Sequence, residues 1–194
     1  MADLVIVDYG AGNVKSVEFA FNRLGVKPVL SSDAEVISNA KRVIFPGVGH
    51  AEFAMNALKS KGLDAAIKGL KVPVLGICLG MQLMCNRTEE GNVEGLAIFD
   101  TVVNKFPAEN KIPHMGWNNI KTDGCSLFKG IPEESYFYFV HSYYAASCAN
   151  TSSVCDYILP FSASLEKDNF FGCQFHPEKS GEMGERLLGN FLNL

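Results

Sequence analysis

Three short, continuously apolar runs in the first half of the chain constrain its fold more than any other feature. They span residues 4–7, 43–45 and 72–77, and each precedes a segment in which apolar residues recur at helical spacing. After the first run, the positions at this spacing are Val14, Val17, Phe21 and Leu24, followed by Gly25. Strands without polar alternation are buried on both faces, as in parallel sheets covered by helices. The pattern predicts an α/β fold.

The second half of the chain has closely spaced strand candidates separated by turn residues, at 136–140, 153–158, 162–165 and 170–175. Such spacing predicts that some of these strands run antiparallel. Helices are expected over 79–86 and over 182–194, where the second has one apolar face to dock on the sheet. We predict one domain over 1–194, with an open, mostly parallel central sheet flanked by helices and additional antiparallel strands in the C-terminal half.

Charge and cysteine content narrow the classes of function. The net charge is −4 without a basic cluster, which argues against a nucleic-acid partner. The N-terminal apolar run is too short for a signal peptide or a membrane span, so we expect a cytoplasmic protein. A chain of this length builds its own core, and its six cysteines are expected to be reduced. There is no CxxC pair, and we predict neither a metal nor a cofactor.

Cys78 stands in the sequence Gly76-Ile77-Cys78-Leu79-Gly80, which has the form Gly-x-nucleophile-x-Gly. In this motif a strand turns sharply into a helix, and the nucleophile takes a strained backbone conformation. The helix N-terminus favours a thiolate, and the N–H group of Leu79 becomes available to an oxyanion. A buried strand ending in a small apolar cysteine has the same local sequence, so both interpretations stay open at this stage.

A second motif, His176-Pro177-Glu178, follows an apolar strand near the C-terminus. Proline fixes φ, which allows the carboxylate of Glu178 to be held beside the His176 ring. A histidine beside a strand is ordinarily just a hydrogen-bonded structural residue. Combined with the motif at Cys78, this one favours a Cys-His-Glu triad, in which the carboxylate orients the imidazole and the imidazole exchanges protons with the thiol.

Three shorter motifs bear on ligand binding. Pro46-Gly47-Val48-Gly49 follows an apolar run and provides either oxyanion N–H groups or a plain strand-to-helix turn. Gln82 lies on the same helix face as Cys78, where it contacts substrate or is simply an exposed glutamine. Lys15 stands where a dinucleotide loop would have its third glycine, so we reject a Rossmann cofactor site and predict Asn13 as a helix N-cap.

The motifs together resemble those of the class I, triad-type glutamine amidotransferases. The residues that carry this resemblance are Gly76–Gln82, Pro46–Gly49 and Phe175–Glu178. More narrowly, the chain is similar to the glutaminase subunits of imidazole glycerol phosphate synthases, from about residue 5 to about residue 190. The strings that carry this narrower resemblance are Asp8–Asn13, Pro113–Asn118, Tyr138–Tyr143 and His176–Ser180.

The resemblance implies hydrolysis of glutamine to glutamate and ammonia. Cys78 would attack the side-chain amide, His176 would protonate the departing ammonia, and Glu178 would orient His176. Leu79 and Val48 would provide oxyanion N–H groups, Val48 after a peptide flip. The residues implied to line the glutamine site are Gly47, Val48, Leu79, Gln82, Ser142 and Tyr143.

The resemblance also implies a heterodimer with a (β/α)₈-barrel cyclase, which uses the ammonia to form imidazole glycerol phosphate and an aminoimidazole carboxamide ribonucleotide in histidine biosynthesis. Asn13, Trp117 and Lys179 would face this partner, although Trp117 by itself is typical of a core or rim aromatic. His114 and His141 are expected to be structural. Two alternatives stay open: a glutaminase of another synthase, in surface-sugar or cofactor synthesis, and a non-catalytic module with Cys78 as a redox sensor.

Overall fold

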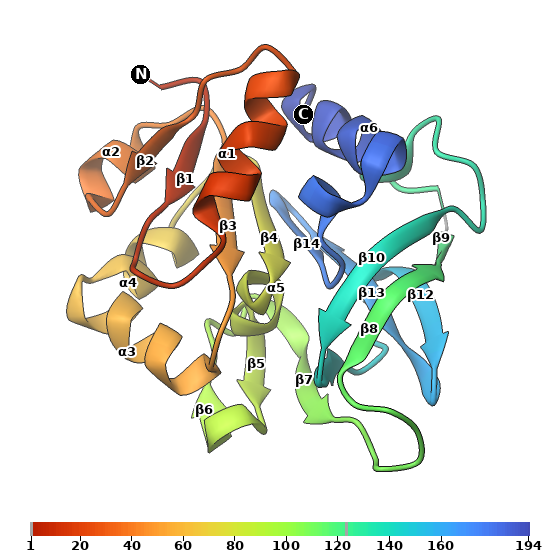
Figure 1. Cartoon of the computed structure of the whole chain (residues 1–194). Helices are drawn as coiled ribbons and strands as arrows, with labels where there is room; N and C mark the ends of the chain where they lie inside the picture. The colour runs from red at the N-terminus through yellow and green to blue at the C-terminus, as the bar shows by residue number, and fades with distance from the viewer. Residues whose placement is uncertain (1, 123) are drawn as a thin grey trace.

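The computed structural model describes residues 2–122 and 124–194 (Figure 1). Its helices are α1 Val14–Arg23, α2 Ala34–Ser38, α3 Ala51–Ser60, α4 Leu63–Lys68, α5 Leu79–Leu83 and α6 Gly181–Leu192. Its strands are β1 Val5–Val7, β2 Val29–Ser31, β3 Val43–Gly47, β4 Val74–Cys78, β5 Cys85–Thr88, β6 Val93–Glu94, β7 Phe99–Lys105, β8 His114–Asn119, β9 Lys121–Thr122, β10 Tyr136–His141, β11 Tyr143–Ala145, β12 Thr151–Tyr157, β13 Leu159–Lys167 and β14 Phe170–Cys173. None of the helices in the described part of the chain combines the length and the apolar character that crossing a membrane requires.

The central sheet has the strand order β2-β1-β3-β4-β14-β13-β12-β9. The first five strands in this order are parallel, with β4 between β3 and β14. The pairs that follow, from β14 to β9, are antiparallel. The predicted parallel sheet with antiparallel C-terminal strands is therefore confirmed, and the ends of β3, β4 and β14 meet at one edge.

Alternate residues of the apolar strands fill two cores, one on each face of this sheet. Val5 and Val7 pack with side chains of α2, α3 and α4, whereas Leu4 and Ile6 pack with side chains of α1 and α6. Figure 1 shows α1 and α6 side by side on one face of the sheet. Burial on both faces explains why these strands lack polar alternation.

Two smaller sheets were not predicted from the sequence. β5, β6, β7 and β11 form one, and β8 pairs with β10 as a separate antiparallel ribbon. The expected helix over 79–86 is wrong in its C-terminal part, because α5 ends at Leu83 and Cys85 opens β5. The N–H groups of Leu96 and Ile98 bond to the carbonyls of Leu83 and Met84, so this stretch of backbone joins a sheet instead of another helical turn.

Candidate active site

Cys78 lies where β4 turns into α5. It is the N-cap of that helix, with φ 54° and ψ −112°, and its side chain is buried, with the residue 8% exposed. A positive φ in a residue with a Cβ is strained and is typical of a nucleophile held on a sharp turn. The local geometry thus agrees with the nucleophile interpretation of the Gly-x-Cys-x-Gly motif.

The positions around Cys78 require glycine, because neighbouring backbone segments lie too close to leave room for a Cβ. A Cβ on Gly80 would collide with the carbonyl group of Phe45, and one on Gly76 would lie 2.8 Å from the backbone nitrogen of Met81. Across the sheet edge, a Cβ on Gly47 would lie 2.7 Å from the nitrogen of Gly80. The turn at Cys78 and the end of β3 are therefore pressed together with no room for a side chain between them.

Replacing Gly80 with alanine is expected to lower the free energy of unfolding by about 3 kcal/mol, near the upper end of ordinary overpacking, because the colliding atoms belong to the backbone. Urea unfolding followed by circular dichroism measures the change. Gly189→Ala in α6 is the matched control, because a Cβ at this position would meet open space. This substitution should raise the free energy of unfolding by about 0.5–1 kcal/mol, since alanine favours a helix more than glycine does. Equal stability of Gly80→Ala and the parent protein would contradict this packing argument.

His176 and Glu178 are paired behind the thiol. His176 Nδ1 lies 2.8 Å from Glu178 Oε1, and both side chains are almost fully buried. The backbone fixes the imidazole, because the His176 N–H bonds to the Tyr138 carbonyl and the Ser180 hydroxyl bonds to the His176 carbonyl. The Nε2 atom of His176 has no hydrogen-bond partner among the described residues, which leaves it free for proton transfer.

The charge of His176 depends on its neighbours. Burial by itself would lower the pKa of His176, but the hydrogen bond to Glu178 and the charge interactions with Cys78 and Glu178 outweigh it and raise the pKa to about 10. At neutral pH the imidazole therefore carries a proton. A protonated imidazole that lines the same cavity as a thiol has the chemistry of a general acid for a departing amine.

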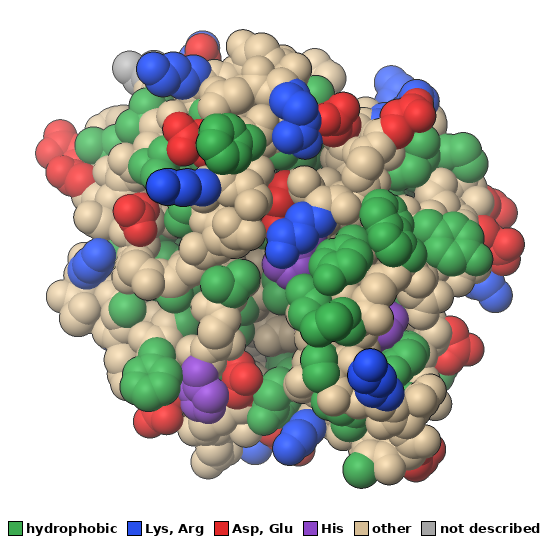
Figure 2. All heavy atoms as spheres, in the orientation of Figure 1, with side chains coloured by type: hydrophobic (Ala, Val, Ile, Leu, Met, Phe, Trp, Pro, Cys, Tyr) green, Lys and Arg blue, Asp and Glu red, His purple; other side chains and the backbone are tan. Residues whose placement is uncertain are grey.

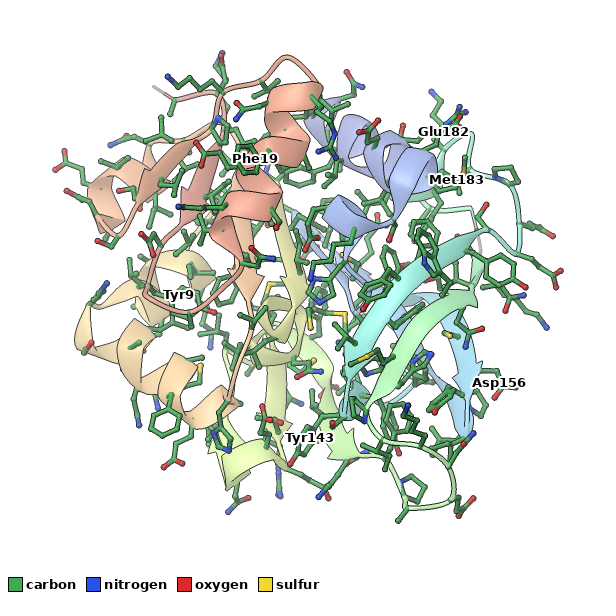
Figure 3. The ribbon with its side chains drawn as sticks, in the orientation of Figure 1. Tyr9, Phe19, Tyr143, Asp156, Glu182 and Met183 are labelled. Atoms are coloured by element: carbon green, nitrogen blue, oxygen red, sulfur yellow. The ribbon has the colours of Figure 1, made fainter. Side chains whose placement is uncertain are left out.

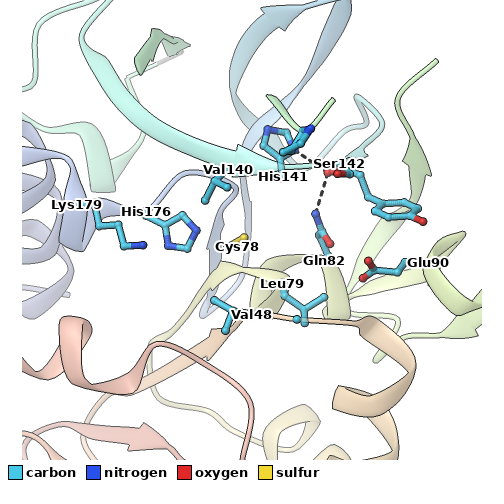
Figure 4. A pocket seen from close by; sticks show the side chains of 13 residues that line it. Val48, Cys78, Leu79, Gln82, Glu90, Val140, His141, Ser142, His176 and Lys179 are labelled. Carbon is cyan, nitrogen blue, oxygen red and sulfur yellow. Dashed lines mark hydrogen bonds between the residues drawn. The ribbon is translucent and has the colours of Figure 1, made fainter. Parts of the chain in front are cut away.

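A cavity of about 360 Å³ opens in front of Cys78 and His176 (Figure 4). Val48, Leu79, Gln82, Ser142, Tyr143 and Lys179, all named from the sequence, also line it. Glu178 and Gly47 do not line this cavity; with Asn13 they border a separate narrow crevice that His176 also lines. Sequences far apart in the chain thus converge on one cavity.

Gln82 is buried, not exposed. One N–H of its amide donates to the Tyr143 carbonyl (2.9 Å), and the other donates to Gln174 Oε1 (2.8 Å). Both amide hydrogens are consumed, so Gln82 can offer a ligand only the acceptor Oε1. Gln82 can therefore contact only a hydrogen-bond donor of a substrate.

Sequence reasoning missed three polar residues of this site. Glu90 and His141 line the cavity, and the Glu90 carboxylate also accepts the N–H of Ala51 at the start of α3. Gln174 is fully buried and lies against the thiol. No motif marks Glu90, but Gln174 was detectable as a lone polar residue in an apolar segment, two residues before the His-Pro-Glu motif.

Of the three residues expected to face a partner, Lys179 lines the cavity, whereas Asn13 and Trp117 do not. Asn13 is the N-cap of α1, as predicted, and its side chain accepts the N–H of Ser16 at 3.4 Å. Trp117 is 55% exposed on β8, and Lys179 Nζ lies 5.9 Å from the centre of the Tyr138 ring. Alternate positions of the paired strands β8 and β10 place Met115, Trp117, Tyr136 and Tyr138 on one face, which we call the ribbon patch. Figure 2 shows hydrophobic side chains gathered over this ribbon.

The model of the family described as glutamine amidotransferase class-I matches residues 5–194. The imidazole glycerol phosphate synthase subunit HisH of Bacteroides thetaiotaomicron is 55% identical, over 98% of this chain and 99% of the relative. The subunit of the same name from Yersinia pseudotuberculosis is 48% identical, over 99% of this chain and 100% of the relative. The chain belongs to the class I glutamine amidotransferases, in their HisH group.

Solved structures agree on the fold of this class I glutamine amidotransferase. A crystal structure of a glutamine amidotransferase matches with a TM-score of 0.74 at 16% identity, over 97% of both chains. The PurLQS structure from Thermotoga maritima matches with a TM-score of 0.72 at 17% identity, over 99% of this chain and 98% of that one. The family model and the HisH relatives together identify the protein as a glutamine-hydrolysing amidotransferase. They favour an enzyme over the non-catalytic module with a redox-sensing cysteine.

Proposed function

We propose that this amidotransferase hydrolyses glutamine through a triad of Cys78, His176 and Glu178. The observation that carries the proposal is the thiol at the sharp turn from β4 into α5, which shares a cavity with an imidazole held by a carboxylate 2.8 Å away. The three groups perform the nucleophilic, proton-transferring and orienting tasks of covalent amide hydrolysis. Within the described residues, no cluster of His, Cys, Asp and Glu is arranged to hold a metal ion.

The reaction begins when the Cys78 thiolate attacks the side-chain amide carbon of glutamine, forming a tetrahedral oxyanion. The N–H groups of Leu79 and Val48 stabilise this oxyanion, Val48 after its peptide turns toward it. The amide nitrogen leaves as ammonia with the proton from His176, and a glutamyl thioester remains. Water attacks the thioester while His176 takes its proton, so glutamate and the thiolate are released and one water is consumed per glutamine.

The cavity also supports recognition of the amino-acid end of glutamine. Glu90 and Gln82 line it on the side away from His176, and Figure 4 shows both side chains there. A carboxylate and the remaining acceptor Oε1 of Gln82 suit the α-ammonium group, which has only donors. Ser142 and Tyr143 border the same end, and Gly47 supports the oxyanion loop from behind.

We further propose that the enzyme delivers its ammonia to a (β/α)₈-barrel cyclase in a heterodimer of histidine biosynthesis. The relatives are named subunits of imidazole glycerol phosphate synthase, which supports such a partner. The ribbon patch supports a docking surface, because exposed aromatic residues anchor protein interfaces. Asn13, Trp117 and Lys179 face the cyclase in this proposal. We also propose that residues 1–194 form a single domain. We propose a cytoplasmic location as well, since six free cysteines fit a reducing compartment.

The decisive experiment is an assay of glutamate formation by this protein alone, and with the cyclase and its nucleotide ligand. We expect the cyclase to stimulate glutamine hydrolysis and to convert the ammonia into imidazole glycerol phosphate. Trp117→Ala should weaken cyclase binding about tenfold or more, because it removes a large exposed aromatic anchor. Isothermal titration calorimetry measures this affinity.

Val36→Ala is the matched control for Trp117→Ala. Val36 is an exposed apolar residue on α2, outside the ribbon patch, and its replacement should leave the affinity unchanged. Stimulation by a synthase of surface-sugar or cofactor synthesis, with none by the cyclase, would overturn the assignment to histidine biosynthesis and leave the glutaminase assignment intact.

A further inference from the structure

Gln174 occupies an unusual place for a polar residue. It directly follows β14, it is fully buried, and its side chain lies between Gln82 and Cys78. Its Nε2 lies 3.6 Å from the sulfur of Cys78, and its Oε1 lies 2.8 Å from Gln82 Nε2. The reaction steps described above do not use this residue.

The hydrogen bonds around Gln174 have only one consistent polarity. The Tyr143 backbone carbonyl is purely an acceptor, so the Gln82 amide must present its nitrogen to it, at 2.9 Å. The second hydrogen of the same nitrogen then meets Gln174 Oε1. A reversed Gln174 amide would place an N–H against that N–H. Gln174 must therefore direct its own N–H at the Cys78 sulfur.

The Tyr143 carbonyl that sets this polarity is itself held in place. His141 Nδ1 lies 2.7 Å from it, and the partner of His141 Nε2 is His114 Nδ1, at 3.0 Å. Burial lowers the pKa of His141 to about 3 and that of His114 to about 4, so both rings are neutral at pH 7. His141 then donates to Tyr143 from Nδ1 and accepts from His114 at Nε2. The two histidines expected to be structural thus fix the acceptor on which the orientation depends.

We propose that Gln174 is a further catalytic residue, which donates a hydrogen bond to the Cys78 sulfur and so favours the thiolate over the thiol. The inference rests on the proposed function, in which Cys78 is the nucleophile, and it adds a donor to that site. A hydrogen bond to a charged acceptor is stronger than one to a neutral thiol, so the bond stabilises the reactive form preferentially.

The other titratable groups around the sulfur leave a role for this donor. His176 lines the same cavity and supplies a positive charge, and Lys179 lies at the cavity wall. Tyr9, in the loop between β1 and α1 (Figure 3), donates its hydroxyl to the Pro46 carbonyl, and burial raises its pKa. The Cys173 thiol points to the Gly76 carbonyl, and burial raises its pKa as well. Both therefore stay neutral beside Cys78.

The test measures the rate at which iodoacetamide alkylates Cys78 as a function of pH, with the modified peptide identified by mass spectrometry. Gln174→Met keeps the size of the side chain but removes the N–H. We expect the pH midpoint of alkylation to rise by about one to two units, and the rate at pH 7 to fall about 10- to 100-fold. Above the new midpoint the rate should return to the parent value. Gln174→Glu should raise the midpoint further, because it places a carboxylate beside the sulfur.

Ser164→Ala is the control for loss of buried hydrogen bonding alone. Its hydroxyl is shared with Ser152 and Ser153 on β12, away from the sulfur, so it should lower stability without moving the alkylation midpoint. An unchanged midpoint in Gln174→Met, with rapid alkylation in the parent protein, would overturn the role of Gln174 alone. Slow alkylation of Cys78 in the parent protein would instead count against Cys78 as the nucleophile. If Gln174→Glu does not fold, Gln174→Met still decides the question.

Discussion

Replacing Cys78 with alanine is expected to abolish glutamate formation, with a fall of about 10⁴-fold or more in kcat, also in the presence of a stimulating partner. The Cys78 sulfur is the atom that attacks the amide in the proposed reaction. Among the described residues, no other cysteine lines the cavity. The residual rate would reflect only binding and the oxyanion donors. An assay of glutamate release at saturating glutamine measures the loss.

Cys125→Ala is the matched control for this variant. Cys125 is a partly buried cysteine just before a short 3₁₀ turn at Ser126–Phe128, remote from α5 in the sequence and absent from the cavity wall. Its replacement should leave kcat unchanged. Retained turnover in Cys78→Ala would remove Cys78 as the nucleophile and would require another residue to form the covalent intermediate.

Glu178→Gln should lower kcat by about 10²- to 10⁴-fold while changing KM little, because in the proposed reaction Glu178 orients the imidazole from outside the substrate cavity. The glutamine amide keeps the shape of the carboxylate but not its charge. NMR titration should also show a lower pKa for His176 than the value of about 10 in the parent protein. A variant with parent-like kcat and an unchanged His176 pKa would contradict the orienting role.

The same pKa predicts how stability depends on pH. The folded-state pKa of His176 lies above its unfolded value of about 6.5, so the proton on His176 favours the folded state. This contribution is fully present below about pH 6.5 and is lost as the pH rises through about 10. The parent protein should therefore lose more stability than Glu178→Gln between these pH values, as measured by urea unfolding.

The central fold was predictable because strands that are buried on both faces appear in the sequence as continuous apolar runs. The runs at 4–7 and 43–45 are apolar without interruption, and each lies in the parallel sheet as β1 and β3. The ribbon of β8 and β10 could not be predicted in this way, because β8 mixes polar and apolar residues over His114–Asn119 and only its first residue is buried. The end of α5 was missed because its carbonyls are taken by a distant backbone segment, which no local pattern reports.

The candidate site was predictable where its residues sit on motifs that backbone geometry demands. Cys78 needs glycines on both sides, and His176 is followed by a proline that fixes its carboxylate neighbour, so these positions could be named in advance. Glu90 could not, since it reaches the cavity from a turn after β5 through tertiary packing alone. Gln82 was named, but its burial and the loss of both its donors depend on Gln174 and Tyr143, which the spacing of the sequence does not connect.

The positive φ of Cys78 lowers the stability of the fold at the position that carries the proposed nucleophile. A positive φ on a residue with a Cβ costs about 1–3 kcal/mol, which glycine at the same position would avoid. A library of variants selected only for resistance to heat would therefore favour glycine at position 78 and lose the thiol. If Cys78 is the nucleophile, as proposed, activity and heat resistance therefore require different residues at this one position.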